Sequence, residues 1–182
     1  RVNLGEYIYN DHKYKLINLN EREKSYYIEG YFQSHKYFCN YIDEIKKYLY
    51  IDEDLKQNII KKFNSYQKPI LSIHVRLSDY LKYPDFHPIP TIDYYKKALS
   101  YYNLENYQII LFSDDVEMAN EKLKPLNLDY INANTIYQGD EEQLYMLMLS
   151  DIRVATNSTF SIMAAYLNEM FLFKENCEYI FP

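Results

Sequence analysis

The short apolar run Ile70-Leu71-Ser72-Ile73, which leads directly into His74-Val75-Arg76-Leu77-Ser78-Asp79, is the stretch that decides the fold. Its length and its isoleucines are typical of a buried strand. Three further runs of strand length follow along the chain, at 107–112, 127–131 and 152–155. Helices are predicted around these runs, at 92–103, 115–123, 140–150 and 159–168.

Strands that alternate with helices favour a parallel sheet, because parallel neighbours need long crossover connections. We therefore expect an α/β fold over residues 67–182, a Rossmann-like parallel sheet with helices on both faces. Residues 1–66 contain two short strand-like runs, the better of them at 26–32. An apolar helical stripe follows across 38–49, and a second helix starts at Asp52 as N-cap. We expect this region to be the remnant of an N-terminal, acceptor-side part with its linking helices.

Composition and charge argue against several classes of function. The 182 residues include 20 Lys or Arg and 26 Asp or Glu, a formal net charge of −6, whereas nucleic-acid binding rests on clustered cations. No apolar run approaches the roughly 18 to 20 residues of a membrane span. Cys39 and Cys177 stand apart from one another and from any His at ligand spacing, so neither a disulfide framework nor a metal site is expected.

Localisation and oligomeric state are not fixed by these residues. The sequence favours a place in the cytoplasm or at the periphery of a membrane, and nothing in it specifies self-association.

Polar clusters follow three of the predicted strands directly. They are 74–79 after the first strand, Ser113-Asp114-Asp115 after the second, and Thr156-Asn157-Ser158-Thr159 after the fourth. Parallel strands end at the same edge of a sheet, and doubly wound sheets bind ligands beyond the carboxyl ends of their strands. The sequence therefore predicts that the three clusters meet in a binding site at one rim.

Two of these clusters suit a diphosphate. Arg76 offers a fixed charge and planar donors that would stabilise a leaving diphosphate; the alternative is a structural ion pair with Asp79 or Asp85. Asn157-Ser158-Thr159 precedes a predicted helix, whose first turn offers free N–H groups and a positive dipole end to a phosphate. For this turn the alternative is a plain helix cap.

The acidic side chains at this rim also have two interpretations. Ser113-Asp114-Asp115 either starts a helix or offers a carboxylate to the base or ribose of a nucleotide. Asp79, Asp85 and His87 lie in a Pro-rich loop, where one of them would take the proton of an acceptor hydroxyl as general base. They are otherwise solvated loop side chains, and the sequence does not choose among them.

Several stretches of the chain resemble the α-1,2-fucosyltransferases of glycosyltransferase family 11. His74 to Tyr80 is similar to the family's His-x-Arg-Arg-x-Asp motif, and Phe112-Ser113-Asp114-Asp115 stands in its expected place. The other matching stretches are Gly30 to Phe38, Leu144 to Ser150, Asn157 to Ser161 and Ala165 to Asn168.

This resemblance implies the donor-binding domain of a GT-B glycosyltransferase, with GDP-fucose as donor substrate and no cofactor or obligatory metal. It also implies transfer of L-fucose with inversion to a galactose-terminated oligosaccharide or glycan, in α-1,2 linkage. In the family's scheme Arg76 and the turn from Asn157 to Phe160 hold the diphosphate, while His74 and Asp114 lie near the nucleotide or the acceptor. The catalytic candidates are Arg76, Asp79 and His74; the donor-binding candidates are Arg76, Ser113, Asp114, Asn157, Ser158, Thr159 and Phe160.

The sequence departs from the family pattern at three places. Leu77 stands where family members carry a second Arg, Ser78 replaces Gly, and Ile162-Met163 replaces an aromatic pair. Loss of a charge that acts in the transition state would lower the rate by about 10²–10³-fold, and we find no counterpart of the family's N-terminal Gly-Asn-Gln motif. The alternatives are therefore a catalytically impaired or partial nucleotide-sugar-binding module without transferase activity, and a structural domain that binds no nucleotide.

Overall fold

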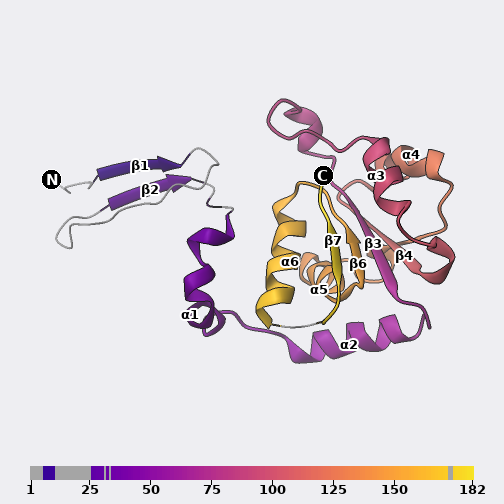
Figure 1. Cartoon of the computed structure of the whole chain (residues 1–182), viewed down its shortest axis with the longest axis horizontal. Helices are drawn as coiled ribbons and strands as arrows, with labels where there is room; N and C mark the ends of the chain where they lie inside the picture. The colour runs from indigo at the N-terminus through magenta and orange to yellow at the C-terminus, as the bar shows by residue number, and fades with distance from the viewer. Residues whose placement is uncertain (1–5, 11–25, 31, 33, 172–173) are drawn as a thin grey trace. The chain divides into compact units, whose positions relative to one another are not determined.

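The computed structural model describes residues 6–10, 26–30, 32, 34–171 and 174–182. Contacts divide the chain into two compact units, Arg1–Tyr50 and Ile51–Pro182, which are described separately here (Figure 1). The predicted division into an acceptor-side remnant at 1–66 and a Rossmann-like domain at 67–182 stays a prediction. Helix α2 (Glu53–Asn64) lies in the second unit, where it packs on helix α5 (Asp140–Leu149).

The first unit contains a two-stranded parallel ribbon and short helical turns. Strand β1 (Glu6–Asn10) pairs with β2 (Tyr26–Gly30), with Glu6 opposite Tyr26 and Asn10 opposite Gly30. The ribbon is followed by η1 (His35–Tyr37), η2 (Cys39–Tyr41) and α1 (Ile42–Lys46).

Two predictions for this unit are wrong in extent. The predicted strand over 26–32 ends at Gly30: Phe32 has a φ of 48°, and Tyr31 lies outside the described residues, as does Gln33. The predicted helix across 38–49 is α-helical only over α1. Short helices depend on packing of an apolar face, and two residues of the predicted stripe are instead exposed, Tyr41 and Leu49.

The second unit is built on a five-stranded, all-parallel sheet with the order β5-β4-β3-β6-β7. Its strands are β3 (Ile70–Val75), β4 (Gln108–Ser113), β5 (Ile131–Asn132), β6 (Ile152–Val154) and β7 (Glu178–Ile180). Its other helices are α3 (Ile92–Leu99), α4 (Val116–Leu123) and α6 (Thr159–Phe171), with 3-10 turns η3 (Tyr80–Lys82), η4 (Leu104–Asn106), η5 (Lys124–Leu126) and η6 (Ala133–Thr135). The predicted Rossmann-like sheet is confirmed.

Alternate residues of β3 face two separate helical layers, which is the period-2 geometry of a strand. Leu71, Ile73 and Val75 lie in a buried cluster with apolar residues of α3 and α4. Ile70 lies in a second cluster, formed with residues of α2, α5 and α6, and His74 contacts Ser161 of α6. Helices thus cover both faces, and the even-numbered side chains of β3 point towards α6.

The end caps follow from the sequence at two of the helices. Asp52 caps α2 as predicted, because its carboxylate accepts a hydrogen bond of 2.9 Å from the Leu55 N–H. Asp115 caps α4 in the same way, through the N–H of Met118 at 3.0 Å. Such caps satisfy donors that would otherwise lack an intrahelical partner.

The strands differ from the prediction by one residue at β4 and β6, and by more elsewhere. The predicted strand 127–131 is reduced to β5, because Asn127 ends η5 in the left-handed conformation, with a φ of 48°. Strand β7 was not predicted. Strand β3 continues to Val75, so His74 lies within the sheet and not in the loop after it.

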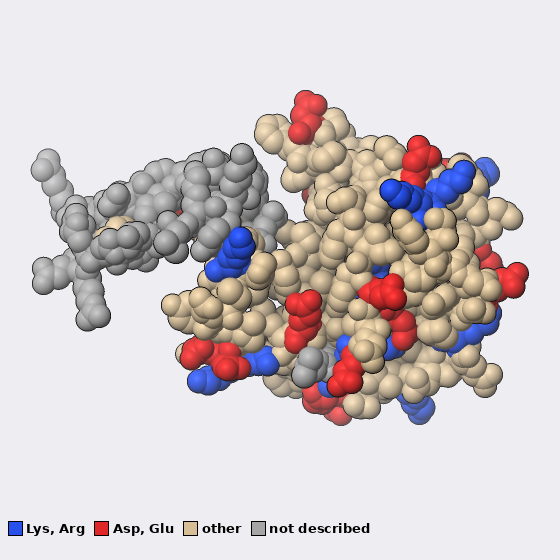
Figure 2. All heavy atoms as spheres, in the orientation of Figure 1, with Lys and Arg blue, Asp and Glu red and all other residues tan. Residues whose placement is uncertain are grey.

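Acidic and basic side chains are interspersed over the face of the molecule shown in Figure 2, and the basic side chains do not gather into one large patch there. Among the described helices, none has both the length and the apolar character that a membrane crossing requires.

Candidate functional site

The carboxyl ends of β3, β4 and β6 bring the three predicted polar clusters to one rim of the sheet. Asp114, which follows β4, accepts hydrogen bonds of 2.9 Å from the backbone of Leu77 and Ser78, which follow β3. The Tyr80 hydroxyl then donates to the Asn157 carbonyl, beyond β6, at 3.3 Å. The predicted meeting of the clusters is therefore seen directly in hydrogen bonds.

Asp114 fixes the loop that begins at Leu77. One carboxylate oxygen takes the N–H of Leu77, and the other takes the N–H of Ser78 and lies 3.4 Å from Nε of Arg76. Burial raises the pKa of this carboxyl, but the hydrogen bonds from Ser78 and Leu77 outweigh burial, so its net pKa is lowered. Asp114 is thus an ionised structural acceptor, and its predicted contact with a nucleotide stays a prediction.

Ser113 and Asp115 form the start of a helix, which was one of the two roles that the sequence left open for them. The Ser113 hydroxyl accepts from the Asp115 N–H at 3.1 Å and donates to the Asp115 carbonyl at 3.0 Å. Together with the Asp115 cap, these bonds form the start of α4. The predicted role of Ser113 in donor binding stays a prediction.

Arg76 makes its ion pairs with one side of its guanidinium. Its Nε lies 2.9 Å from Asp79 and 3.4 Å from Asp114, and 35% of its side chain is exposed. Among the residues that the structure describes, no acceptor bonds to its terminal Nη groups. The ion pair expected as the structural alternative therefore exists, and it leaves the outer donors of Arg76 available to an anion.

Asp79 and the other candidate bases lie in the loop after Arg76. The hydrogen bond from Arg76 lowers the pKa of the Asp79 carboxyl, and a carboxylate held in this way is a weaker base. Asp85 is exposed, whereas His87 is half-buried and stacks on the Tyr80 ring, with centroids 4.6 Å apart.

His74 is buried beneath the rim, with 6% of its surface exposed. Its Nδ1 forms a short hydrogen bond with the Ser161 hydroxyl, and its ring meets that of Phe160 edge-on at 5.8 Å. Burial lowers the pKa of His74 to about 4, with the Asp114 charge opposing this shift and the Arg76 charge adding to it. At neutral pH His74 is therefore an uncharged imidazole that joins β3 to the first turn of α6.

The turn before α6 is a cap that also exposes donors. The Ser158 hydroxyl accepts from the Phe160 N–H at 3.3 Å, and the first full helical bond runs from the Ile162 N–H to the Ser158 carbonyl at 3.1 Å. In the described part of the chain, the N–H groups of Thr159 and Ser161 have no protein acceptor. Both interpretations of this turn are therefore compatible with its geometry.

Tyr80 and Pro88 are parts of this rim that the sequence did not single out. Asn157 donates from Nδ2 to the Pro88 carbonyl at 3.0 Å and accepts from the Tyr80 hydroxyl at its own carbonyl. Tyr80 stands in the stretch that matches the family motif, which was the available signal. A contact to a Pro carbonyl has no sequence signal, because any residue provides that acceptor.

Leu77 lies differently from what its sequence position implied. The prediction placed a missing phosphate-directed charge here, yet the Leu77 side chain is 3% exposed and belongs to the core cluster beneath α3 and α4. Arg76 directly precedes it and pairs through Nε with Asp79 and Asp114. Position 77 therefore supports the core in this chain.

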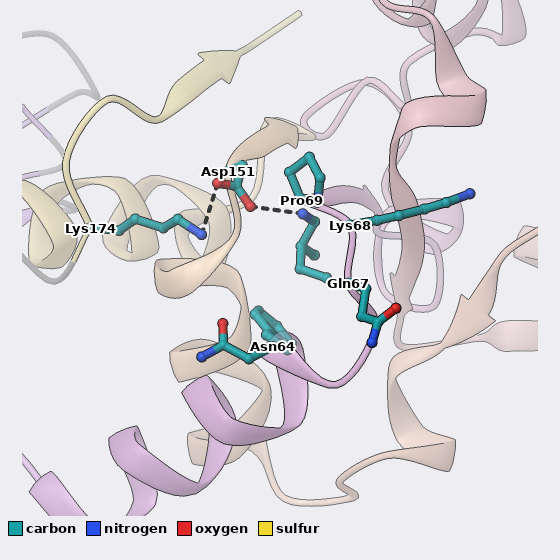
Figure 3. Close-up of a pocket in the computed structure, with 8 residues that line it drawn as sticks. Asn64, Gln67, Lys68, Pro69, Asp151 and Lys174 are labelled. Atoms are coloured by element: carbon teal, nitrogen blue, oxygen red, sulfur yellow. Dashed lines mark hydrogen bonds and ion pairs between the residues drawn. The ribbon is translucent and has the colours of Figure 1, made fainter.

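A cavity of about 310 Å³ lies at the opposite, amino end of β3 (Figure 3). Lys174 and Asp151 point towards one another there at 2.8 Å, and Asp151 also accepts from the Ile70 N–H at 2.7 Å. Its lining residues are Phe63, Asn64, Gln67, Lys68, Pro69, Ile70, Asp151 and Lys174. This cavity is separate from the predicted rim. Within the described residues, no group of three His, Cys, Asp or Glu side chains is placed to hold a metal ion.

Comparisons with known proteins place the chain in a family. The sequence profile described as glycosyl transferase family 11 matches residues 5–170, whereas no curated protein matches the sequence. POFUT1 in complex with GDP is a similar solved structure, with a TM-score of 0.53, 17% identity, and coverage of 75% of this chain and 50% of POFUT1. POFUT1 in complex with GDP-fucose gives a TM-score of 0.52 and 17% identity over 75% of this chain and 49% of POFUT1.

The chain thus spans about half the length of these POFUT1 chains, and at such identity the similarity concerns the fold alone. It agrees with the observed parallel sheet in supporting a GT-B-like fold. Because the profile covers most of the sequence and its motif residues gather at the carboxyl rim, the chain belongs to glycosyl transferase family 11.

Proposed function

We propose that this chain is the donor-binding part of a fucosyltransferase, which holds GDP-fucose at the carboxyl rim of its sheet. The observation that carries the proposal is a pair of donor sets on that rim that have no acceptor among the described residues: the Nη groups of Arg76, and the N–H groups of Thr159 and Ser161. Family membership and the GDP-fucose complex of POFUT1 support the choice of ligand. GDP-fucose is a donor substrate in this proposal, and no cofactor takes part.

In the proposed reaction, an acceptor hydroxyl attacks the anomeric carbon of fucose as the bond to the β-phosphate oxygen breaks. The configuration at that carbon inverts, and GDP leaves with the bonding electron pair. Arg76 and the start of α6 would stabilise the negative charge that grows on the diphosphate, which is where electrostatic stabilisation lowers a barrier most. His74, neutral and hydrogen-bonded to Ser161, would keep this first helical turn in place.

The proton of the acceptor hydroxyl needs a base on the acceptor side. Asp79, Asp85 and His87 remain the candidates, and the hydrogen bond from Arg76 lowers the pKa of the Asp79 carboxyl, which makes Asp79 a weaker base. We propose a galactose-terminated glycan as the acceptor and an α-1,2 linkage in the product, both on the strength of the family.

A second function rests on Leu77, which stands where members of the family carry a second Arg. A module that binds the nucleotide sugar without transferring fucose is therefore the alternative.

Calorimetry with GDP, GDP-fucose and GDP-mannose, followed by a transfer assay on lactose, tests both functions. Arg76→Ala should weaken GDP binding by about 10- to 100-fold, because hydrogen bonds to charged groups contribute about 1.5–3 kcal/mol each. Lys174→Ala is the matched control, since it removes a cation at the amino rim and should leave GDP affinity unchanged. Equal GDP affinity in wild type and Arg76→Ala would contradict the proposed site. Binding without transfer would favour the non-catalytic module.

A further inference from the structure

The loop of residues 77–90, here called the clasp loop, is tied to the start of α6 by two hydrogen bonds through one residue. Asn157 accepts from the Tyr80 hydroxyl at 3.3 Å and donates to the Pro88 carbonyl at 3.0 Å. The same loop is fixed at its first residues by Asp114. Arg76 directly precedes the loop, so these bonds join the two donor sets of the proposed diphosphate site.

Tyr80 is the buried member of this connection. Only 7% of its surface is exposed, and its ring stacks on His87 with an interplanar angle of 14°. Burial raises the pKa of its hydroxyl. The hydroxyl is therefore a protonated donor to the Asn157 carbonyl.

We propose that Tyr80 is a positioning residue, whose hydroxyl sets the distance between the Arg76 guanidinium and the free N–H groups at the start of α6. The inference rests on the proposed function, because it assumes that these two groups bind one diphosphate. A diphosphate held from two sides needs both donor sets at a fixed separation, and small misplacements weaken or slow such sites steeply. Tyr80 itself would touch neither phosphate.

The inference predicts a selective defect. Without the hydroxyl, the turn before α6 retains its own cap through Ser158, and Asp114 still fixes Leu77 and Ser78. Each donor set therefore survives, but their separation is less well defined. Affinity for a diphosphate should fall, whereas affinity for the nucleoside alone should not.

Tyr80→Phe removes only the hydroxyl and keeps the ring that stacks on His87. We expect it to weaken GDP binding by about tenfold and to leave guanosine binding unchanged, both measured by NMR titration. Tyr130→Phe is the matched control, because its hydroxyl bonds to Asn120 at 2.8 Å, at the α4 side of the sheet. It should leave binding of both ligands unchanged, while thermal melting reports any loss of stability in either variant.

A double-mutant cycle with Arg76→Ala shows whether Tyr80 affects GDP binding by positioning Arg76 or independently of Arg76. If Tyr80 acts by aligning Arg76 with the turn, Tyr80→Phe should cost less GDP affinity in the Arg76→Ala background than in wild type. Additive losses would overturn the inference, as would equal losses of GDP and guanosine affinity. Wild-type GDP affinity in Tyr80→Phe would overturn it while the proposed function stands. A wild-type protein that binds no GDP would overturn both.

Discussion

The two rims of the sheet in the second unit each carry a carboxylate that binds backbone N–H groups beside a cation, but the two sites differ in what the cation can still bind. At the amino rim, the Asp151 carboxylate accepts the N–H of Ile70 at the start of β3 and pairs with Lys174. At the carboxyl rim, the Asp114 carboxylate accepts two N–H groups just beyond β3 and lies beside Arg76. Each rim thus combines a carboxylate, the backbone at one end of the central strand and one cation.

The difference between the rims lies in what the cation has left to offer. The Lys174 ammonium points at Asp151 (Figure 3), so the two opposite charges at the amino rim pair with one another. Arg76 meets both of its carboxylates through Nε, and its planar fork retains donors on the outer side. A structural ion pair and a ligand site are therefore compatible in one arginine, which is why the sequence alone left the two alternatives open.

The largest expected effect concerns the buried side chain of Leu77 at the carboxyl rim. Leu77→Arg should lower the free energy of unfolding by about 3–5 kcal/mol, because it places an unpaired charge in the cluster beneath α3 and α4. Urea denaturation measures the loss, and Leu77→Met, which conserves volume, should cost less than about 1.5 kcal/mol. A stable Leu77→Arg variant with tighter GDP binding would show that position 77 faces the ligand and would break the comparison.

Asp114 should be the more stabilising of the two rim carboxylates. Asp114→Ala leaves two backbone N–H groups without their acceptor and should lower the free energy of unfolding by about 3–4 kcal/mol. Asp114→Asn keeps one acceptor oxygen. Its free energy of unfolding, measured by urea denaturation, should therefore lie between those of Asp114→Ala and wild type. A loss below about 1 kcal/mol would mean that water replaces the carboxylate at little cost.

His74 makes the carboxyl rim sensitive to acid. Its pKa is lowered from 6.5 to about 4 in the folded protein, so between these values the unfolded chain binds more protons than the folded one. The free energy of unfolding should therefore fall by about 3 kcal/mol as the pH drops from 6.5 to about 4. The lowered pKa values of Asp79 and Asp114 reduce stability as the pH falls towards and below 3.8, so they add to the loss only at the acid end of this window.

Urea denaturation at several pH values between 7 and 4 measures the effect. His74→Asn, which lacks the titrating group, should give a flatter profile over the same window. Equal slopes in wild type and variant would assign the acid sensitivity to other groups.

The sequence predicted the sheet and the meeting of the rim clusters well, for a physical reason. Buried parallel strands are rich in apolar residues, as in the run at 109–112, and their shared direction places His74, Asp114 and Asn157 at one end. The sequence predicted less well those elements whose extent depends on tertiary contacts. β7 is only three residues long, and at residues 38–49 an apolar stripe exists without the packing that would extend the helix.

The face on which each rim side chain lies was within reach of the sequence but was not used. Continued beyond the end of β3, strand alternation puts Arg76 with His74 and Leu77 with Val75, and in the structure Val75 and Leu77 lie in the same core cluster. A family comparison by position alone missed it. The Tyr80 and Pro88 contacts depend on loop geometry, which no local pattern specifies.

The smallest expected effect is at the amino rim. Asp151→Ala removes one acceptor of a backbone N–H and a partly exposed ion pair, and such exposed pairs contribute about 0–1 kcal/mol. We expect a loss of about 1–2 kcal/mol in the free energy of unfolding, clearly less than for Asp114→Ala, with GDP affinity unchanged. Urea denaturation and calorimetry on the same preparation measure both quantities. If Asp151→Ala weakened GDP binding as strongly as it weakened folding, the amino rim would share in ligand binding, and the division of roles between the two carboxylates would not hold.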